Sequence, residues 1–210
     1  MSTRPVSPHS LDLADQLREW AGRALAALVR DQDRLNRINV YEIPDGDTGT
    51  NLVRTLGYGC SALTEVPHGL PATQMCADFA TALWRNASGC SGLILASTLK
   101  PMLAAFADHG RIDVDGLVEG LQQAAIAAAL AVARPMAGTM VTVVEEAARS
   151  AKAAAPDCVV VAEAVRAAGR AAVEKSQAQI PVLTRARVVD AGALGLSLVF
   201  DALCDVVAKG

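Results

Sequence analysis

Two aspartates, Asp45 and Asp47, stand one residue apart in the polar segment EIPDGDTGTN at positions 42–51. Such a segment buries little apolar surface, so its composition does not serve a core. Two carboxylates this close repel each other unless a cation lies between them. Few protein oxygen ligands are typical of Mg²⁺ bound with a nucleotide, because the ion keeps waters and takes oxygens from phosphates. The segment therefore predicts a site for a metal ion and phosphate.

Two other interpretations of this segment are possible. An aspartate-rich turn could simply cap the helix that follows it. A calcium loop of the EF-hand type fits less well, because it needs an oxygen ligand, a glycine and a glutamate at its fifth, sixth and twelfth positions. Those positions hold Gly49, Thr50 and Leu56. The sequence also contains no P-loop motif and no strand-associated G-x-G-x-x-G motif, which excludes the common nucleotide folds.

Three further segments are glycine-rich and polar. They are NASGCSG at 86–92, RPMAGTM at 134–140 and VVDAGALG at 188–195. Like the first segment, each falls where a helix is expected to begin. Each can therefore present free backbone N–H groups and the positive end of a helix dipole to an anion. If the four segments meet at one end of the fold, they form a phosphate site.

No side chain in these segments is suited to covalent catalysis. His9, His68 and His109 lie outside all four segments, and the chain has no serine hydrolase elbow or cysteine–histidine signature. We therefore expect no catalytic residue. The five cysteines are odd in number and form no C-x-x-C pair, so they are expected to be buried, reduced thiols in the cytoplasm. Cys90 is interpreted as a small residue in a tight turn.

The composition predicts an all-α protein with a single domain over residues 1–210. Hydrophobic residues make up 52% of the chain but aromatic residues only 3%, and alanine, leucine and valine carry the excess. The net charge is −3 without a basic block, which favours neither nucleic acid nor an anionic membrane as a partner. The most apolar run, residues 124–133, is too short to span a membrane.

Periodic apolar positions separated by turn signals divide the chain into eight helices. Because the connections are short, consecutive helices are expected to be antiparallel. Asp113 and Asp157 are expected N-caps and Gly110 a helix stop, whereas Pro135 and Pro181 are assigned to connections. The expected helices span residues 10–36, 50–66, 71–86, 91–108, 114–133, 138–155, 158–178 and 190–208.

The four segments resemble the nucleotide-binding domain of the dihydroxyacetone kinase superfamily, of the DhaL type. The resemblance rests on NVYEIPDGDTGTNL, NASGCSGLIL, RPMAGTMVTVVEEA and PVLTRARVVDAGALGL, which together extend over nearly the whole chain. Such domains form the L subunit of bacterial dihydroxyacetone kinases and the N-terminal ATP-binding domain of the fatty acid kinase A subunit. The motifs look more like the second and the chain length more like the first. The resemblance implies a barrel of eight antiparallel helices with the nucleotide site at one end.

The resemblance also implies roles for individual residues. Asp45 and Asp47 become magnesium ligands. Asn39 stands near the place of a third family aspartate, so a second ion would be held less strongly, or by Glu42 instead. The implied nucleotide contacts are Thr48, Gly49, Thr50, Asn51, Ser91, Gly92, Gly138, Thr139, Met140, Asp190, Ala191 and Gly192.

These roles imply an ATP·Mg²⁺-binding subunit of a two-component kinase, with ATP or ADP and one or two magnesium ions. The acceptor would be a hydroxyketone or a fatty acyl group, held by a substrate-binding kinase subunit or a fatty-acid carrier protein. One alternative is a subunit that keeps ADP as a cofactor and is rephosphorylated by a phosphotransfer protein. Another is a nucleotide-sensing regulatory module that transfers nothing. A homodimer is also left open. The arginine that the kinase L subunit uses near the nucleotide has no clear counterpart here, because Arg185 and Arg187 lie downstream.

Overall fold

The computed structural model describes residues 12–64 and 70–209. Within these ranges the chain forms nine α-helices and no strands, which confirms the all-α prediction. His9 and His68 lie outside these ranges. The N-terminal end of the expected helix 10–36 and the C-terminal end of the expected helix 50–66 also lie outside them. The helices are α1 (Leu13–Arg37), α2 (Thr48–Thr64), α3 (Ala72–Arg85), α4 (Gly89–His109), α5 (Val114–Leu130), α6 (Met140–Ala153), α7 (Cys158–Gln179), α8 (Pro181–Ala186) and α9 (Ala191–Val207).

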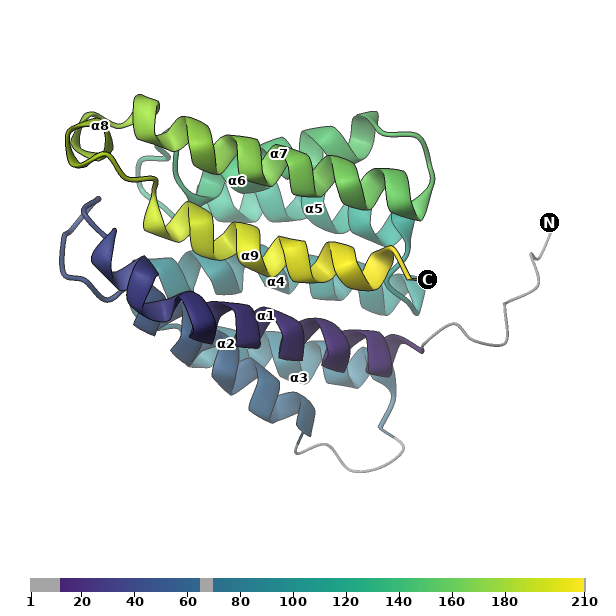
Figure 1. Ribbon diagram of the computed structural model, residues 1–210. Coiled ribbons are helices and arrows are strands. Elements are labelled where there is room, and N and C mark those ends of the chain that lie inside the picture. The colour runs from purple at the N-terminus through teal and green to yellow at the C-terminus, as the bar shows by residue number, and fades with distance from the viewer. Residues whose placement is uncertain (1–11, 65–69, 210) are drawn as a thin grey trace.

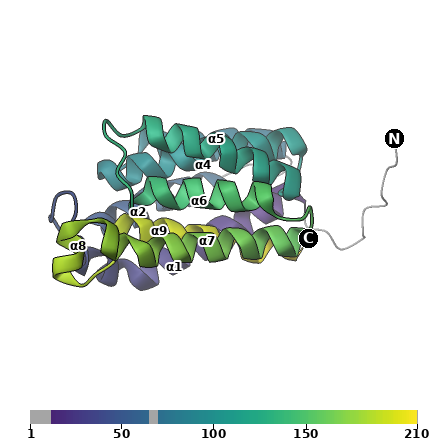
Figure 2. The ribbon, with the colours of Figure 1, turned by 90° about the horizontal axis from the view of Figure 1, so that it is seen from above.

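Eight of these helices form a closed barrel, as predicted. From α1 to α7, each helix packs against the next one in the chain, and α9 packs against both α7 and α1. Figures 1 and 2 show the long helices running side by side. The indole ring of Trp20 makes edge contacts with Phe79 and Phe106 at centroid distances of 6.2 and 6.0 Å. These three buried rings join α1, α3 and α4 in one hydrophobic core.

The short helix α8 was not predicted from the sequence, which assigned Pro181 to a connection. Proline is favoured at the first helical position because its missing N–H would have no partner there. Arg187 ends the helix in a left-handed conformation with φ 56°. Helix α8 packs on α7 and lies within the α7–α9 connection, so it adds no wall to the barrel (Figure 1).

Three expected helix boundaries, at Gly110, Asp113 and Asp157, are confirmed. The Asp113 side chain accepts a hydrogen bond from the Gly116 N–H at 2.8 Å and caps α5. Asp157 caps α7 in the same way. Gly110 ends α4 with φ 69°, a left-handed conformation that costs glycine little. These three boundaries therefore follow from local residue chemistry.

Successive connections of an antiparallel barrel alternate between its two ends. The α1–α2, α3–α4, α5–α6 and α7–α9 connections consequently share one end, here called the polar end. These connections contain residues 38–47, 86–88, 131–139 and 180–190. The α2–α3, α4–α5 and α6–α7 connections lie at the opposite end (Figure 1). All four glycine-rich segments of the sequence therefore meet at the polar end.

Helix α4 is the one described helix that is long and apolar enough to cross a membrane by length and composition. Most of it is buried, and it contacts α2, α3, α5 and α6. Its apolar character is therefore that of a core helix in the barrel.

Candidate functional site

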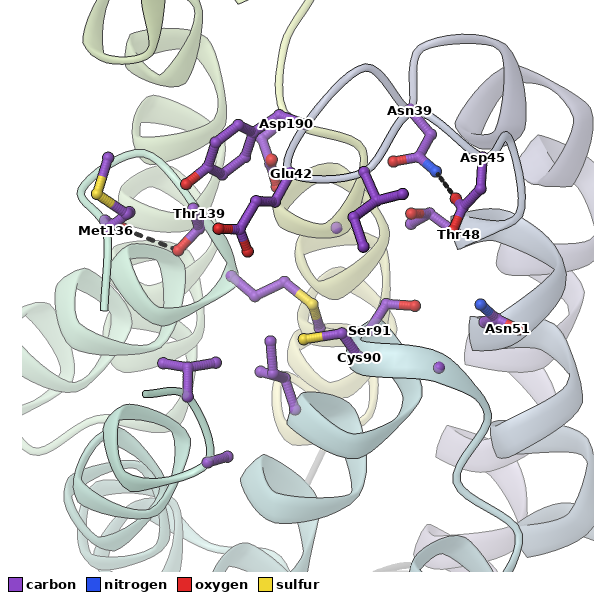
Figure 3. A pocket seen from close by; sticks show the side chains of 18 of the residues that line it. Asn39, Glu42, Asp45, Thr48, Asn51, Cys90, Ser91, Met136, Thr139 and Asp190 are labelled. Atoms are coloured by element: carbon purple, nitrogen blue, oxygen red, sulfur yellow. Dashed lines mark hydrogen bonds between the residues drawn. The ribbon is translucent and has the colours of Figure 1, made fainter. Parts of the chain in front are cut away.

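A pocket of about 580 Å³ opens at the polar end. Its lining is contributed by the α1–α2, α5–α6 and α7–α9 connections and by the N-terminal residues of α2, α4, α6 and α9 (Figure 3). The predicted site residues in the lining are Asn39, Asp45, Asp47, Thr48, Asn51, Ser91, Thr139, Met140, Asp190 and Gly192. Segments more than a hundred residues apart in the sequence are thus brought together around one cavity.

Two predicted contacts, Gly49 and Thr50, face α1 and are not in the lining. The Thr50 hydroxyl accepts hydrogen bonds from the side-chain amides of Gln32 at 3.3 Å and Asn36 at 3.0 Å. The Thr50 N–H donates to Asn36 Oδ1 at 3.1 Å. A Cβ atom on Gly49 would lie 2.4 Å from the backbone oxygen of Gln32. Both residues therefore hold the first turn of α2 against α1.

Three other predicted contacts also lie outside the lining. A Cβ atom on Gly92 would lie 2.3 Å from the Thr55 hydroxyl oxygen, so α4 approaches α2 too closely for a side chain. Gly138 has φ 88°, and its added Cβ would lie 3.0 Å from Gln179 Oε1. Ala191 is buried at the start of α9. These residues shape the pocket through packing.

The expected metal ligands lie together on the α1–α2 side of the pocket. Asn39 is buried and its Nδ2 donates to Asp45 Oδ1 at 2.7 Å (Figure 3). Asp45 is exposed and Asp47 half-buried. Among the described residues, no three histidine, cysteine or acidic side chains converge closely enough to hold a metal ion by themselves. This open set of oxygen donors suits Mg²⁺ bound with phosphates, and a half-turn of the Asn39 amide would present its oxygen as well.

Two helices begin at the pocket without a side-chain cap. Ser88 and Thr139 are the N-cap residues of α4 and α6, and in the described structure neither side chain accepts a hydrogen bond from the helix it precedes. The Thr139 hydroxyl instead donates to the Met136 carbonyl at 2.8 Å. The first turns of both helices line the pocket. Their unpaired N–H groups and dipoles make this part of the pocket suited to an anion.

Asp190 has a structural function at the edge of the pocket. Its side chain accepts from the Ala193 N–H at 2.7 Å and caps α9. Its own N–H donates to the Ser176 hydroxyl at 2.9 Å, which ties the α7–α9 connection to α7. Burial raises the pKa of Asp190 to about 6, although hydrogen bonds from Ala193 and Gly192 act in the opposite direction. Keeping the ionised Asp190 carboxylate in the folded protein therefore costs free energy.

The pocket has an apolar side that sequence reasoning missed. Ile94 of α4 and Val132 and Met136 of the α5–α6 connection contribute to it, beside the predicted contact Met140 of α6. Figure 3 shows Met136 and Thr139 across the cavity from Asn39, Asp45, Thr48 and Asn51. Ile94 and Val132 look like core residues in the sequence because they are apolar residues of expected helices, whereas Met136 stands inside a quoted motif.

Four polar lining residues were also not assigned to the nucleotide from the sequence: Tyr41, Glu42, Cys90 and Arg134. Burial raises the pKa of Tyr41, and the charges of Glu42 and Asp190 raise it further. Cys90 was expected to be buried, but it is exposed at the pocket. The signal for Tyr41 and Arg134 was their position inside the quoted motifs.

The described residues thus form an all-α barrel with a pocket at one end, and the pocket lining is partly polar and partly apolar. Residues 42–205 match the DAK2 domain, and the chain belongs to this family. Uncharacterized proteins of Staphylococcus aureus (strain bovine RF122) and Staphylococcus haemolyticus are each 31% identical to it over 179 residues. The aligned region covers 83% of this chain but only 32% of those proteins, so the chain spans about a third of the length of these curated relatives.

The fold is also that of a solved kinase. The dihydroxyacetone kinase of C. freundii superimposes in its native form with a TM-score of 0.68 at 19% identity. Its complex with AMP-PNP and Mg²⁺ gives a TM-score of 0.67 at 22% identity. Each match covers 98% of this chain and 37% of the kinase chain. Together with the DAK2 match, these similarities confirm the resemblance to the dihydroxyacetone kinase superfamily.

Proposed function

We propose that residues 1–210 act as a single nucleotide-binding domain, the ATP·Mg²⁺-binding subunit of a two-component kinase. The main supporting observation is the pocket at the polar end, where carboxylates, uncapped helix N-termini and an apolar side face the same cavity. Membership of the DAK2 family and the fold of a dihydroxyacetone kinase support the same proposal.

In this proposal Asp45 and Asp47 hold one or two magnesium ions, together with Asn39. Bound Mg²⁺ neutralises charge on the phosphate oxygens during transfer. Thr48, Asn51 and Ser91 lie in the pocket lining and offer hydrogen-bonding groups to the nucleotide. The side chains of this chain position the phosphates, since phosphoryl transfer needs little covalent help from the protein.

The uncapped first turns of α4 and α6 would receive phosphate oxygens through their backbone N–H groups. Gly92 and Gly138 allow a close approach of the surrounding chain, Ala191 is buried at the start of α9, and Gly192 lines the pocket beside it. The apolar side formed by residues such as Ile94 offers a surface for the base. A nucleotide is amphipathic in the same way, with a charged phosphate chain and a largely apolar ring face.

The acceptor would be supplied by another protein. No histidine lines the described part of the pocket, and the donors already named are assigned to nucleotide and metal. The partner would be a substrate-binding kinase subunit carrying a hydroxyketone such as dihydroxyacetone, or a carrier presenting a fatty acyl group. We place this activity in the cytoplasm, in keeping with the free cysteines of the described structure.

Phosphoryl transfer to dihydroxyacetone tests the proposal. The purified chain is mixed with ATP labelled in the γ-phosphate and Mg²⁺, with and without the substrate-binding subunit of a dihydroxyacetone kinase or a fatty-acid-binding protein. We expect labelled product only when the matching partner is present, and none with Asp45→Ala. Rapid phosphorylation of dihydroxyacetone by the chain alone would place the acceptor site within these 210 residues. Nucleotide binding without transfer to any partner would favour a sensing module.

A further inference from the structure

One charged residue of the pocket lining differs in sign from the other charged residues. Arg134 is the only basic residue among the described residues that line the cavity, whereas Glu42, Asp45, Asp47 and Asp190 contribute carboxyl groups. A lining with this excess of acid repels an anionic ligand unless cations compensate. The α1–α2 side can gain Mg²⁺, but the α5–α6 side depends on Arg134.

The guanidinium of Arg134 is available for a ligand. The side chain is exposed, and none of the described carboxylates lies within ion-pairing distance of it. It also donates no hydrogen bond to another described residue of the protein. An arginine donates in a planar fork that matches the geometry of phosphate oxygens, and it remains charged at any physiological pH.

The backbone around Arg134 has a fixed shape. Pro135 follows it and disfavours a helical conformation at Arg134. Beyond the proline, the Thr139 hydroxyl donates to the Met136 carbonyl at 2.8 Å, and the Gly138 N–H donates to the Thr142 hydroxyl at 2.9 Å. The connection that carries Arg134 is therefore braced against α6.

Arg134 also lies beside an anion-binding feature. Its connection leads into the uncapped N-terminus of α6, where Thr139 and Met140 line the same cavity. The helix dipole and the guanidinium therefore add positive potential to the same side of the pocket. Asp45 and Asp47 belong to the α1–α2 connection, and Figure 3 shows Asp45 across the cavity from Met136 and Thr139.

Building on the proposed nucleotide function, we propose that Arg134 binds the phosphate chain of the nucleotide from the α5–α6 side. The α1–α2 residues that would hold magnesium and Arg134 would then lie on two sides of the phosphates. The ligand class that this residue selects is a nucleoside di- or triphosphate over the uncharged nucleoside. Its contribution is direct contact with phosphate oxygens, which a conservative lysine reproduces only in part.

Calorimetric titration of Arg134→Gln, Arg134→Lys and wild type with ATP, ADP and adenosine tests this inference at constant Mg²⁺. Arg134→Gln is expected to bind ATP and ADP about 10- to 100-fold more weakly and adenosine equally well. Arg134→Lys is expected to lie between Arg134→Gln and wild type. Arg85→Gln is the matched control, because Arg85 is exposed at the polar end but does not line the pocket. It is expected to match wild type for all three ligands.

The possible failures are distinguishable. Wild-type affinities in Arg134→Gln for ATP and ADP would overturn the inference and leave the proposed function intact. An equal loss for adenosine would also overturn it, since the contact would then be with the base or sugar. If wild type itself binds no nucleotide, the proposed function and this inference both fail. The variants are expected to fold, because Arg134 is exposed and contributes little packing. Thermal melting of each variant checks this.

Discussion

The two ends of the barrel differ in how the first N–H groups of their helices are capped. Four helices begin at the opposite end. An aspartate side chain caps three of them, Asp12 on α1, Asp113 on α5 and Asp157 on α7, whereas α3 follows Pro71 without a side-chain cap. At the polar end α4 and α6 begin without a side-chain cap in the described structure, although Ser88 and Thr139 occupy their N-cap positions. Aspartate caps therefore predominate at the opposite end, whereas the polar end leaves the first N–H groups of α4 and α6 available.

Aspartates at the two ends therefore perform different tasks. The Asp113 carboxylate accepts a hydrogen bond from the Gly116 N–H. Asp45 receives only the Asn39 amide and remains exposed in a pocket. Asp190 is the exception at the polar end, because it caps α9 while it also lines the cavity. The comparison predicts that substitutions at one end change stability and that substitutions at the other change ligand binding.

The largest expected effect is on binding at the polar end. Asp45→Ala or Asp47→Ala is expected to weaken ATP·Mg²⁺ binding by about 100-fold or more, because each removes a charged metal ligand from a loop. The melting temperature without ligand should change little, since neither side chain packs in the core. Calorimetric titration measures the first effect and thermal unfolding the second. Unchanged affinity in both variants would remove the metal assignment.

A smaller effect is expected from the capping carboxylate that lies at the polar end. The pKa of Asp190 is raised from 3.8 to about 6 in the fold, so the native state binds the proton more tightly than the unfolded state. Its contribution to stability is therefore greatest below about pH 4 and declines as the pH rises to 6. Asp190→Asn keeps an acceptor for the cap but does not titrate.

The unfolding free energy of Asp190→Asn relative to wild type should therefore increase by about 2 kcal/mol between pH 4 and pH 7. Urea denaturation of both proteins across this pH range measures the difference. A difference that stays constant with pH, or that falls as the pH rises, would show that burial does not govern this carboxyl group.

At the opposite end, the expected effect is on stability alone. Asp113→Ala removes the cap of α5 and should lower the unfolding free energy by about 1 kcal/mol. Nucleotide affinity should be that of wild type, because the α4–α5 connection that contains the residue lies at the far end of the barrel (Figure 1). Urea denaturation and calorimetric titration of the same preparation test both parts. A marked loss of affinity would mean that the two ends are coupled.

The smallest effect is expected at Thr50, a residue that sequence reasoning assigned to the nucleotide. The structure shows its hydroxyl accepting from Gln32 and Asn36 of α1. Thr50→Val should therefore cost less than about 1 kcal/mol of stability, because these exposed hydrogen bonds compete with water. ATP·Mg²⁺ affinity is expected to change by less than about 3-fold. A loss as large as that of Asp45→Ala would restore Thr50 to the binding site.

The fold was largely predictable because local signals mark helix ends. Asp113, Asp157 and Gly110 act through neighbours only a few residues away, so their functions can be inferred from the sequence. The common location of the four polar segments also follows from the order of the helices, since every second connection of an antiparallel barrel lies at the same end. Helix α8 was missed because its six residues, Pro181–Ala186, are too few to show a periodic pattern.

The site was predictable only in part, because burial and contact depend on distant segments. Ile94 and Val132 are apolar residues whose position in a cavity is decided by the packing of other helices. Thr50 and Gly92 lie inside the motifs that surround the pocket, but Thr50 is hydrogen-bonded to Asn36 and Gly92 packs against Thr55. A motif therefore located the pocket, while the three-dimensional structure was needed to separate its lining from its supports.

The most direct test of the central claim is calorimetric titration of the wild-type chain with ATP, once with Mg²⁺ and once with a chelator. If the polar end binds metal and phosphates together, the affinity with Mg²⁺ should exceed that with chelator by about 10-fold or more, because each ligand completes the coordination of the other. Asp45→Ala should abolish this dependence on Mg²⁺. Equal affinities with and without Mg²⁺, or no binding in either condition, would contradict the account.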